Sequence, residues 1–206
     1  MCLFGLELFP VLTLGLLNGW ILLTIFFITE LFLVLSFPKG TRGRLFEYTH
    51  SRWASHHRVM LIIGKTFGLL YILLLAFSPL KLSSPFFYLG MIFYIVGLTG
   101  FVVAIINFRS TPPNQPVTHG LYRYSRNPQI LTILITMLGV SLAVGSGVAL
   151  ILLLLSTVFS RARIIEEEKA CLAQYGEAYR DYLERVPRYL LIRTKVSKYS
   201  IHTLVE

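Results

Sequence analysis

Residues 128–160 read PQILTILITMLGVSLAVGSGVALILLLLSTVFS and contain no charged side chain. The turn Gly145-Ser146-Gly147 interrupts this apolar stretch with small residues, and Pro128 suits the first position of a helix. Apolar windows of about 20 residues are the length that a helix needs to cross the hydrocarbon core of a bilayer. The stretch therefore predicts a tight helical hairpin in a membrane, with spans at about 128–144 and 147–160.

The composition of the whole chain agrees with a membrane protein. Of its 206 residues, 55% are hydrophobic and 14% are charged, whereas soluble domains are about 45–50% apolar and about 25% charged. Three further apolar windows lie at about 11–37, 59–78 and 86–108. We therefore predict an all-α polytopic membrane protein with about five transmembrane helices, forming one integral membrane domain over residues 1–206.

Basic residues mark one side of the predicted membrane. Loops 38–58 and 109–127 and the tail from Arg161 carry most of the lysines and arginines, whereas loop 79–85 carries only Lys81. Because Lys and Arg favour cytoplasmic loops, we expect the N-terminus outside and the C-terminus in the cytoplasm, in a membrane that the sequence does not identify. The net charge of +9 predicts contact with anionic membrane lipids. No nucleic-acid partner is expected, since the basic residues border the spans.

Glu30 and Lys65 lie at similar depth within the first two predicted spans. Two interpretations are open. The side chains form an ion pair between antiparallel helices, or the lysine extends alone to the membrane surface while the carboxyl is protonated or meets water. In either case the expected role is structural.

The histidines of loop 38–58 match no metal-binding pattern. His50, His56 and His57 are accompanied by no cysteine and by a single nearby carboxylate, Glu47. Their spacing differs from that of compact ligand motifs. The loop is interpreted as a basic interfacial segment, and no metal is expected.

A cytoplasmic amphipathic helix is predicted after the hairpin, from about 164 to 185. Apolar and aromatic residues recur there at steps of three and four, which is the helical period, and Pro187 ends the pattern. We expect these tyrosines to pack on the protein or on the lipid headgroups. The face consists of Leu172, Tyr175, Tyr179, Tyr182 and Val186.

Three charged residues, Arg163, Glu167 and Glu168, lie where this helix is expected to leave the membrane. Arg163 and Glu167 are four residues apart, so they share a helix face. One interpretation is an ordinary solvated helix start, at which the helix dipole favours carboxylates. The other is a binding site, since charges beside or within a membrane are costly and commonly functional.

The segment before the hairpin carries groups that complement these carboxylates. Arg126, or backbone N–H groups near Gly120, would bind a carboxylate, while the acidic side chains would bind an ammonium group. Tyr122 and Tyr124 would lie over a sulfonium by cation–π attraction. S-adenosylmethionine has all three groups, so this set of residues favours it as the cofactor.

Five short motifs follow one another in the last part of the chain. They are Val117-Thr118-His119-Gly120-Leu121-Tyr122-Arg123, Arg126-Asn127-Pro128, Arg163-Ile164-Ile165-Glu166-Glu167-Glu168, Tyr175-Gly176-Glu177-Ala178-Tyr179-Arg180-Asp181-Tyr182 and Val186-Pro187-Arg188. In this order and spacing they resemble the superfamily of isoprenylcysteine carboxyl methyltransferases and phospholipid methyltransferases. The chain departs from the pattern at Asn127, where the carboxyl methyltransferases have His, and at Ile130 and Thr132, where Tyr and Gly are usual.

The resemblance implies an integral membrane S-adenosylmethionine-dependent methyltransferase with its cofactor site within residues 116–189. The implied acceptor is lipophilic, and an isoprenylcysteine-carboxylate-like group is the first expectation. An ionised acceptor needs no general base and no covalent nucleophile, so catalysis would consist of positioning and exclusion of water. Arg126 is the expected catalytic residue, orienting an anionic acceptor. The expected cofactor-binding residues are Val117, Gly120, Tyr122, Asn127, Pro128, Arg163, Glu167 and Glu168.

Other functions remain open from the sequence. The acceptor could be a phospholipid amine or a small thiol. The stretch from Cys171 to Gly176 also fits NADPH-dependent membrane reductases of the sterol-reductase type, although those enzymes usually have more spans before the shared half. The residues at Ile130 and Thr132 also fit a non-catalytic membrane protein. Binding of S-adenosylmethionine, of NADPH or of neither discriminates these three classes.

Overall fold

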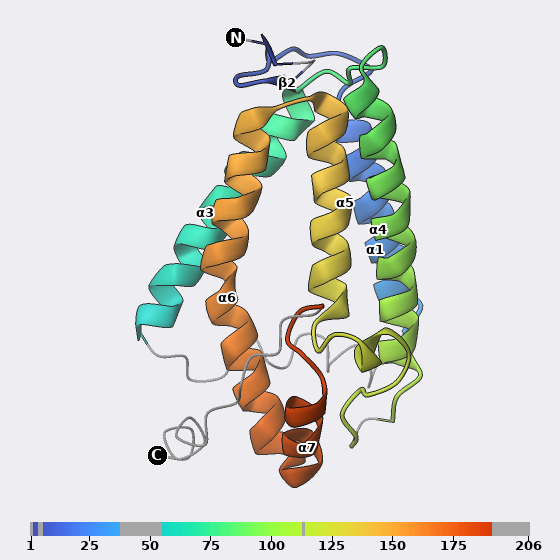
Figure 1. Ribbon diagram of the computed structural model, residues 1–206, viewed down its shortest axis with the longest axis vertical. Helices are drawn as coiled ribbons and strands as arrows, with labels where there is room; N and C mark the ends of the chain where they lie inside the picture. Colours follow the sequence, from blue (N-terminus) through green and yellow to red (C-terminus); the bar gives the residue numbers. More distant parts are fainter. Residues whose placement is uncertain (1, 4–5, 38–54, 113, 191–206) are drawn as a thin grey trace.

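The computed structural model describes residues 2–3, 6–37, 55–112 and 114–190, and almost all of its regular structure is helical (Figure 1). A minimal antiparallel pair, β1 (Cys2–Leu3) and β2 (Leu6–Glu7), precedes the helices. The helices are α1 (Trp20–Leu35), α3 (Ser55–Phe77), α4 (Pro85–Arg109), the 3₁₀ turn η2 (Gly120–Arg123), α5 (Pro128–Val144), α6 (Gly147–Tyr175) and α7 (Glu177–Arg185). The predicted all-α class is confirmed.

The helix lengths and surfaces suit a bilayer. Within the described residues, α3, α4 and α6 are long and apolar enough to cross a membrane, and α1 and α5 are shorter apolar helices of 16 and 17 residues. Large apolar side chains are exposed along the bundle, among them Phe32, Ile62, Tyr88 and Leu154. Exposed apolar surface on this scale marks a membrane contact, so the protein is a polytopic membrane protein, as predicted.

The helical hairpin is present with the predicted inner boundaries. Pro128 occupies the first turn of α5, and Gly145 ends that helix with φ 64° and ψ 41°, a left-handed conformation that glycine adopts without strain. Ser146 then caps α6, because its hydroxyl accepts a hydrogen bond from the Ala149 N–H at 3.1 Å. The glycine that ends α5 and the serine that caps α6 are adjacent in the sequence, and this accounts for the tight turn.

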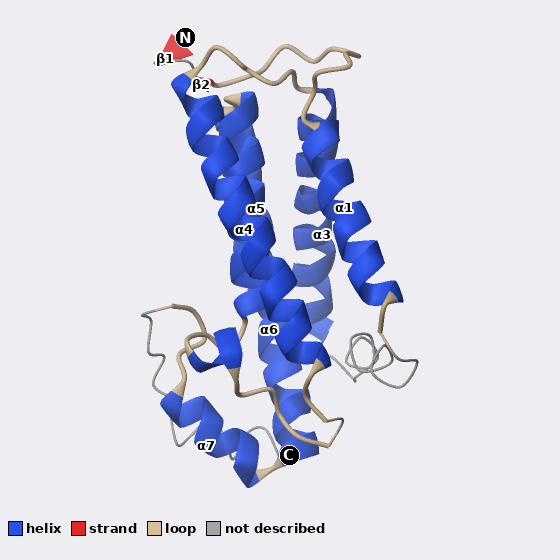
Figure 2. Cartoon of the chain, turned by 90° about the vertical axis from the view of Figure 1, so that its right-hand side faces the viewer, coloured by secondary structure: helices blue, strands red, loops and turns tan. Residues whose placement is uncertain are grey.

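The bundle consists of two closely packed helix pairs, α4 with α5 and α3 with α6, and α1 lies against both (Figures 1 and 2). Glycines allow the backbones of α4 and α5 to approach: a Cβ on Gly90 would lie 2.5 Å from the Gly139 carbonyl oxygen. Thr132 faces Gly100 of α4 across this contact, and its hydroxyl donates to the Pro128 carbonyl at 2.8 Å. The glycine on α4 therefore makes room for the threonine on α5.

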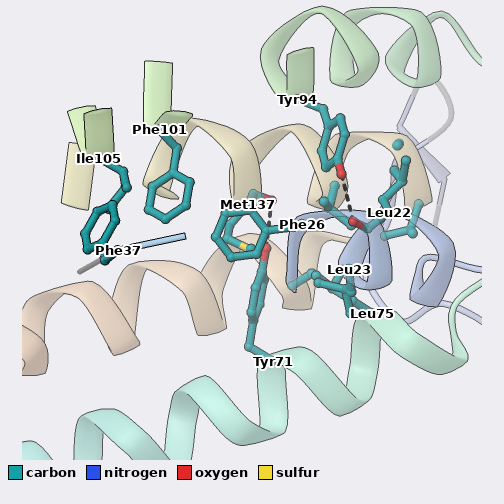
Figure 3. Packing of buried hydrophobic residues seen from close by; sticks show 14 residues of the cluster. Leu22, Leu23, Phe26, Phe37, Tyr71, Leu75, Tyr94, Phe101, Ile105 and Met137 are labelled. Atoms are coloured by element: carbon teal, nitrogen blue, oxygen red, sulfur yellow. Dashed lines mark hydrogen bonds between the residues drawn. The ribbon is translucent and has the colours of Figure 1, made fainter. Parts of the chain in front are cut away.

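The core between the pairs is apolar with a few satisfied hydroxyls (Figure 3). The Tyr71 hydroxyl donates to the Met137 carbonyl at 2.7 Å, which links α3 to α5. The Tyr94 hydroxyl donates to the Leu22 carbonyl at 2.8 Å, which links α4 to α1. A buried polar group that lacks a partner is costly, so these bonds fix how the helices pack.

The described loops divide between the two ends of the bundle (Figures 1 and 2). One end holds the N-terminal segment and residues 78–84 and 145–147. The other end holds residues 110–127, the last turns of α6 from residue 161, and the chain that follows to residue 190. The two basic segments that the structure describes, 110–127 and 161–190, therefore share one end. That this end faces the cytoplasm remains a prediction.

The first predicted span, 11–37, is too long. The helix α1 begins only at Trp20, and residues 11–19 are not helical. Their backbone groups bond to other elements; the Thr13 N–H, for example, donates to the Phe77 carbonyl at 2.8 Å. Tertiary hydrogen bonds to the end of α3 therefore replace the helical ones.

The last predicted span, 147–160, and the predicted helix over 164–185 also need correction. The helix α6 runs without a break through residues 163–168 and ends at Tyr175. Gly176 interrupts it with φ 55° and ψ −131°, and α7 follows. The charged residues thus lie inside a long helix, so the interpretation as a solvated helix start with a favourable dipole is wrong.

Among the ion pairs of the described residues, none joins Glu30 to Lys65. Lys65 is exposed on α3. Of the two interpretations that the sequence left open, the ion pair is therefore not formed, and the lysine that extends alone to the membrane surface stays a prediction. Residues 38–54 and the side chains of His56 and His57 lie outside the described residues, so the expectation about metals in this loop is untested.

Candidate functional site

The 110–127 loop, the start of α5, the last turns of α6 and α7 lie at one end of the bundle (Figure 2). Residues of these elements line a pocket there. Eight of the nine predicted site residues line it, so the fold brings together the polar segments on the two sides of the hairpin. These eight residues are Val117, Tyr122, Arg126, Asn127, Pro128, Arg163, Glu167 and Glu168.

Gly120 is the predicted site residue that does not line the pocket. Its backbone has φ 58°, and a Cβ there would overlap the side-chain amide of Asn107 on α4. Glycine is therefore required for conformation and for close packing of η2 against α4. Its contribution to the site is to shape the loop that carries Val117 and Tyr122.

The loop before α5 is fastened to the segment after α7 by backbone groups. The Arg126 N–H donates to the Pro187 carbonyl at 3.0 Å. The Ser125 hydroxyl donates to the Arg188 carbonyl at 3.1 Å and accepts from the Asn127 N–H at 3.2 Å. The second and fifth motifs of the sequence thus form one local structure.

Arg126, Glu168 and Arg188 form an ion cluster next to these backbone contacts. Glu168 forms an ion pair with Arg126, whose Nη1 lies 3.1 Å from one carboxylate oxygen. Arg188 donates to both oxygens of the same carboxylate, from Nε at 3.0 Å and from Nη2. The Arg126 side chain is 1% exposed and that of Glu168 is 11% exposed. Burial lowers the pKa of Arg126 and the carboxylate opposes that shift; the hydrogen bond to Glu168 raises the pKa of Arg188. Both guanidinium groups remain charged at neutral pH.

Glu167 has a different environment from its neighbour. It bonds to Arg163 at 2.6 Å, one helical turn earlier, and the two side chains are 26% and 59% exposed. An exposed pair of this kind contributes roughly 0–1 kcal/mol. Glu167 can therefore exchange its partner for a ligand cation at small cost.

Tyrosines form one wall of the pocket. Tyr122, Tyr179 and Tyr182 are buried, and the Tyr182 hydroxyl donates to the Tyr122 carbonyl at 2.7 Å. Burial raises the pKa of all three phenols, so they are neutral at physiological pH. The expected packing role of the α7 tyrosines holds, and they also line the site. Tyr124 is 66% exposed and does not line the pocket.

Several pocket residues were not predicted as site residues. None of them is charged. The tyrosines belong to the fourth motif and were interpreted as packing residues, whereas the others had only a position near the motifs as a sequence signal. These pocket residues are Phe108, Pro116, Gln129, Ile130, Cys171, Tyr175, Tyr179 and Tyr182. Within the part of the chain that the structure describes, no group of three or more His, Cys, Asp or Glu residues could hold a metal ion.

A comparison with protein families matches residues 60–178 to the phospholipid methyltransferase family. No curated protein matches the chain, and no solved structure does. The matched range covers more than half of the 206 residues and runs from α3 through α6 into α7, so it includes the loop and helix that form most of the pocket. The family assignment favours methyl transfer over the reductase alternative and agrees with the superfamily that the five motifs resemble. The chain belongs to the phospholipid methyltransferase family of membrane proteins.

Proposed function

We propose that the protein is an integral membrane S-adenosylmethionine-dependent methyltransferase that acts on a lipophilic acceptor. The observation that carries the proposal is the pocket, most of whose lining lies in the family-matched region, where a carboxylate, a buried guanidinium and tyrosine side chains converge. Each of these groups has a counterpart in the cofactor.

The residues present fit S-adenosylmethionine chemically. Glu167 would bind its ammonium group, and Arg126 offers a buried positive charge to an anionic group. The tyrosine wall suits the sulfonium by cation–π attraction, which strengthens when water is excluded. The bound cofactor would supply an electrophilic methyl group. We propose that Val117, Tyr122, Asn127, Pro128 and Arg163 complete the cofactor site.

The protonation states of the side chains that line the pocket favour an acceptor that is already ionised. Among the described residues that line the pocket there is no histidine, and the phenols of Tyr122, Tyr179 and Tyr182 keep their protons because their pKa values are raised. Both glutamates are engaged by arginines. A carboxylate acceptor needs no general base, and positioning with exclusion of water is then sufficient. An isoprenylcysteine-carboxylate-like acceptor is therefore our first proposal.

Lipid-facing elements contribute directly to the pocket. Phe108 lies in the last turn of the membrane helix α4 and Ile130 lies in the first turn of α5, and both line the site. A lipophilic acceptor can therefore keep its tail in the bilayer while its head enters the pocket. We propose that this end of the bundle faces the cytoplasm, as the basic loops predict.

A methyl-transfer assay tests the function and identifies the acceptor. The purified full chain in lipid nanodiscs receives S-adenosylmethionine with a tritiated methyl group and a total lipid extract. A carboxylate acceptor yields a methyl ester, which releases volatile methanol in base, whereas a methylated phospholipid amine keeps its label and a methylated thiol partitions as a small thioether. Absence of label in any product, from folded protein that also binds no cofactor, would overturn the proposal.

A further inference from the structure

Glu168 is already engaged by protein partners. One of its oxygens forms an ion pair with Arg126 Nη1 at 3.1 Å and accepts a hydrogen bond from Arg188 Nε at 3.0 Å, and the other oxygen accepts from the same Arg188 side chain. The cluster contains two guanidinium groups and one carboxylate, so its net charge is +1. Arg126 and Glu168 line the pocket, whereas Arg188 does not line it and its side chain bonds to Glu168.

We propose that Glu168 and Arg188 are positioning residues that hold Arg126 as the receptor for the carboxylate of the cofactor. In this assignment Arg126 binds the cofactor, in place of the acceptor-orienting role expected from the sequence. Glu168 does not bind the ammonium group, which Glu167 binds alone. The inference rests on the proposed function and deepens it by assigning the cofactor's ammonium and carboxylate groups to two different sets of residues.

The energetic comparison of the two glutamates supports this division. Turning Glu168 toward a ligand would leave two largely buried guanidinium groups without their carboxylate, and breaking a buried ion pair is strongly destabilising. Turning Glu167 toward a ligand releases only Arg163, which is 59% exposed and stays solvated. The carboxylate that is free to change partners is therefore Glu167.

The backbone around the cluster restricts Arg126 further. The Arg126 N–H donates to the Pro187 carbonyl at 3.0 Å, and its side chain pairs with Glu168, which Arg188 holds in turn. A guanidinium fixed in this way is preorganised for a planar, two-point contact with a carboxylate. The net positive charge of the cluster attracts the negatively charged carboxylate.

The test compares S-adenosylmethionine with its decarboxylated form, which keeps the ammonium and sulfonium but lacks the carboxylate. Calorimetry on the full chain in detergent measures both affinities for wild type, Glu167→Gln and Glu168→Gln. Wild type should prefer S-adenosylmethionine by roughly tenfold or more, as expected for a charged hydrogen bond. Glu167→Gln should weaken both compounds by the same factor and keep the preference. Glu168→Gln should reduce the preference while leaving the decarboxylated compound within about threefold of wild type.

Arg188→Lys serves as a second variant if Glu168→Gln does not fold. It keeps the positive charge but removes the two-point contact of the guanidinium with Glu168. It should also reduce the preference for S-adenosylmethionine over the decarboxylated compound. Equal weakening of both compounds by Glu168→Gln would make Glu168 an ammonium ligand and overturn the inference. A preference that is missing in wild type, or unchanged in both cluster variants, would also overturn it. If folded wild type bound neither compound, the proposed function itself would fail.

Discussion

Replacing Gly120 by alanine tests how the site loop is built. The residue has φ 58°, and its added Cβ would overlap the Asn107 side chain. An L-residue in the left-handed region costs about 1–2 kcal/mol, and overpacking a tight contact costs about 1–3 kcal/mol. We therefore expect Gly120→Ala to lower the free energy of unfolding by about 2–5 kcal/mol.

A double-mutant cycle with Asn107→Ala separates the two costs. Removing the amide makes room for the new methyl group, so the double variant should recover the overpacking part, about 1–3 kcal/mol, and keep the conformational part. Unfolding in mixed detergent micelles, followed by circular dichroism, measures the free energy of unfolding of wild type, both single variants and the double variant. Losses that add within about 0.5 kcal/mol would show that Gly120 and Asn107 do not interact.

The same variants distinguish shape from ligand contact at Gly120. Since Gly120 lies off the pocket, the double variant should bind S-adenosylmethionine nearly as well as Asn107→Ala alone. A persistent large loss of affinity at restored stability would indicate instead that the Gly120 backbone touches the cofactor.

Three further predictions concern the pocket wall and the topology. Tyr182→Phe removes the donor to the Tyr122 carbonyl, and the unsatisfied buried acceptor should cost about 1–3 kcal/mol in an unfolding titration; an unchanged midpoint would contradict this. With Cys2 replaced by serine, S-adenosylhomocysteine should slow maleimide labelling of Cys171, which lines the pocket, whereas equal rates would place the ligand elsewhere. A cysteine at Ser83, in a chain otherwise without cysteine, should react with an impermeant maleimide from the outside, and reaction from the cytoplasmic side alone would invert the topology.

The hairpin could be predicted closely because local signals coincide with tertiary structure there. Proline at 128 starts α5, and the glycine and serine at 145–146 end one helix and cap the next. Residues 11–19 gave no such signal. An apolar segment that bonds its backbone to the end of α3 has the same composition as one that forms a helix, so hydropathy alone cannot separate them.

The candidate site could be predicted in its residue types but not in its internal pairing. Resemblance to known motifs identified both sides of the pocket, and the fold brings them together. The contact between Glu168 and Arg188 spans 20 residues and crosses the break at Gly176, so no helical spacing rule reveals it. Two adjacent glutamates therefore looked equivalent in the sequence, although their surroundings differ.

Titration of S-adenosylmethionine into wild type, Glu167→Gln and Glu166→Gln tests the central claim most directly. Glu166 is the control, since it is the adjacent glutamate, pairs with Lys169 at 3.3 Å and does not line the pocket. We predict that Glu167→Gln weakens binding by roughly tenfold to hundredfold, the loss of one hydrogen bond to a charged group, while Glu166→Gln binds like wild type. Equal affinity of wild type and Glu167→Gln, at equal melting temperatures, would contradict the assignment of this pocket as the cofactor site.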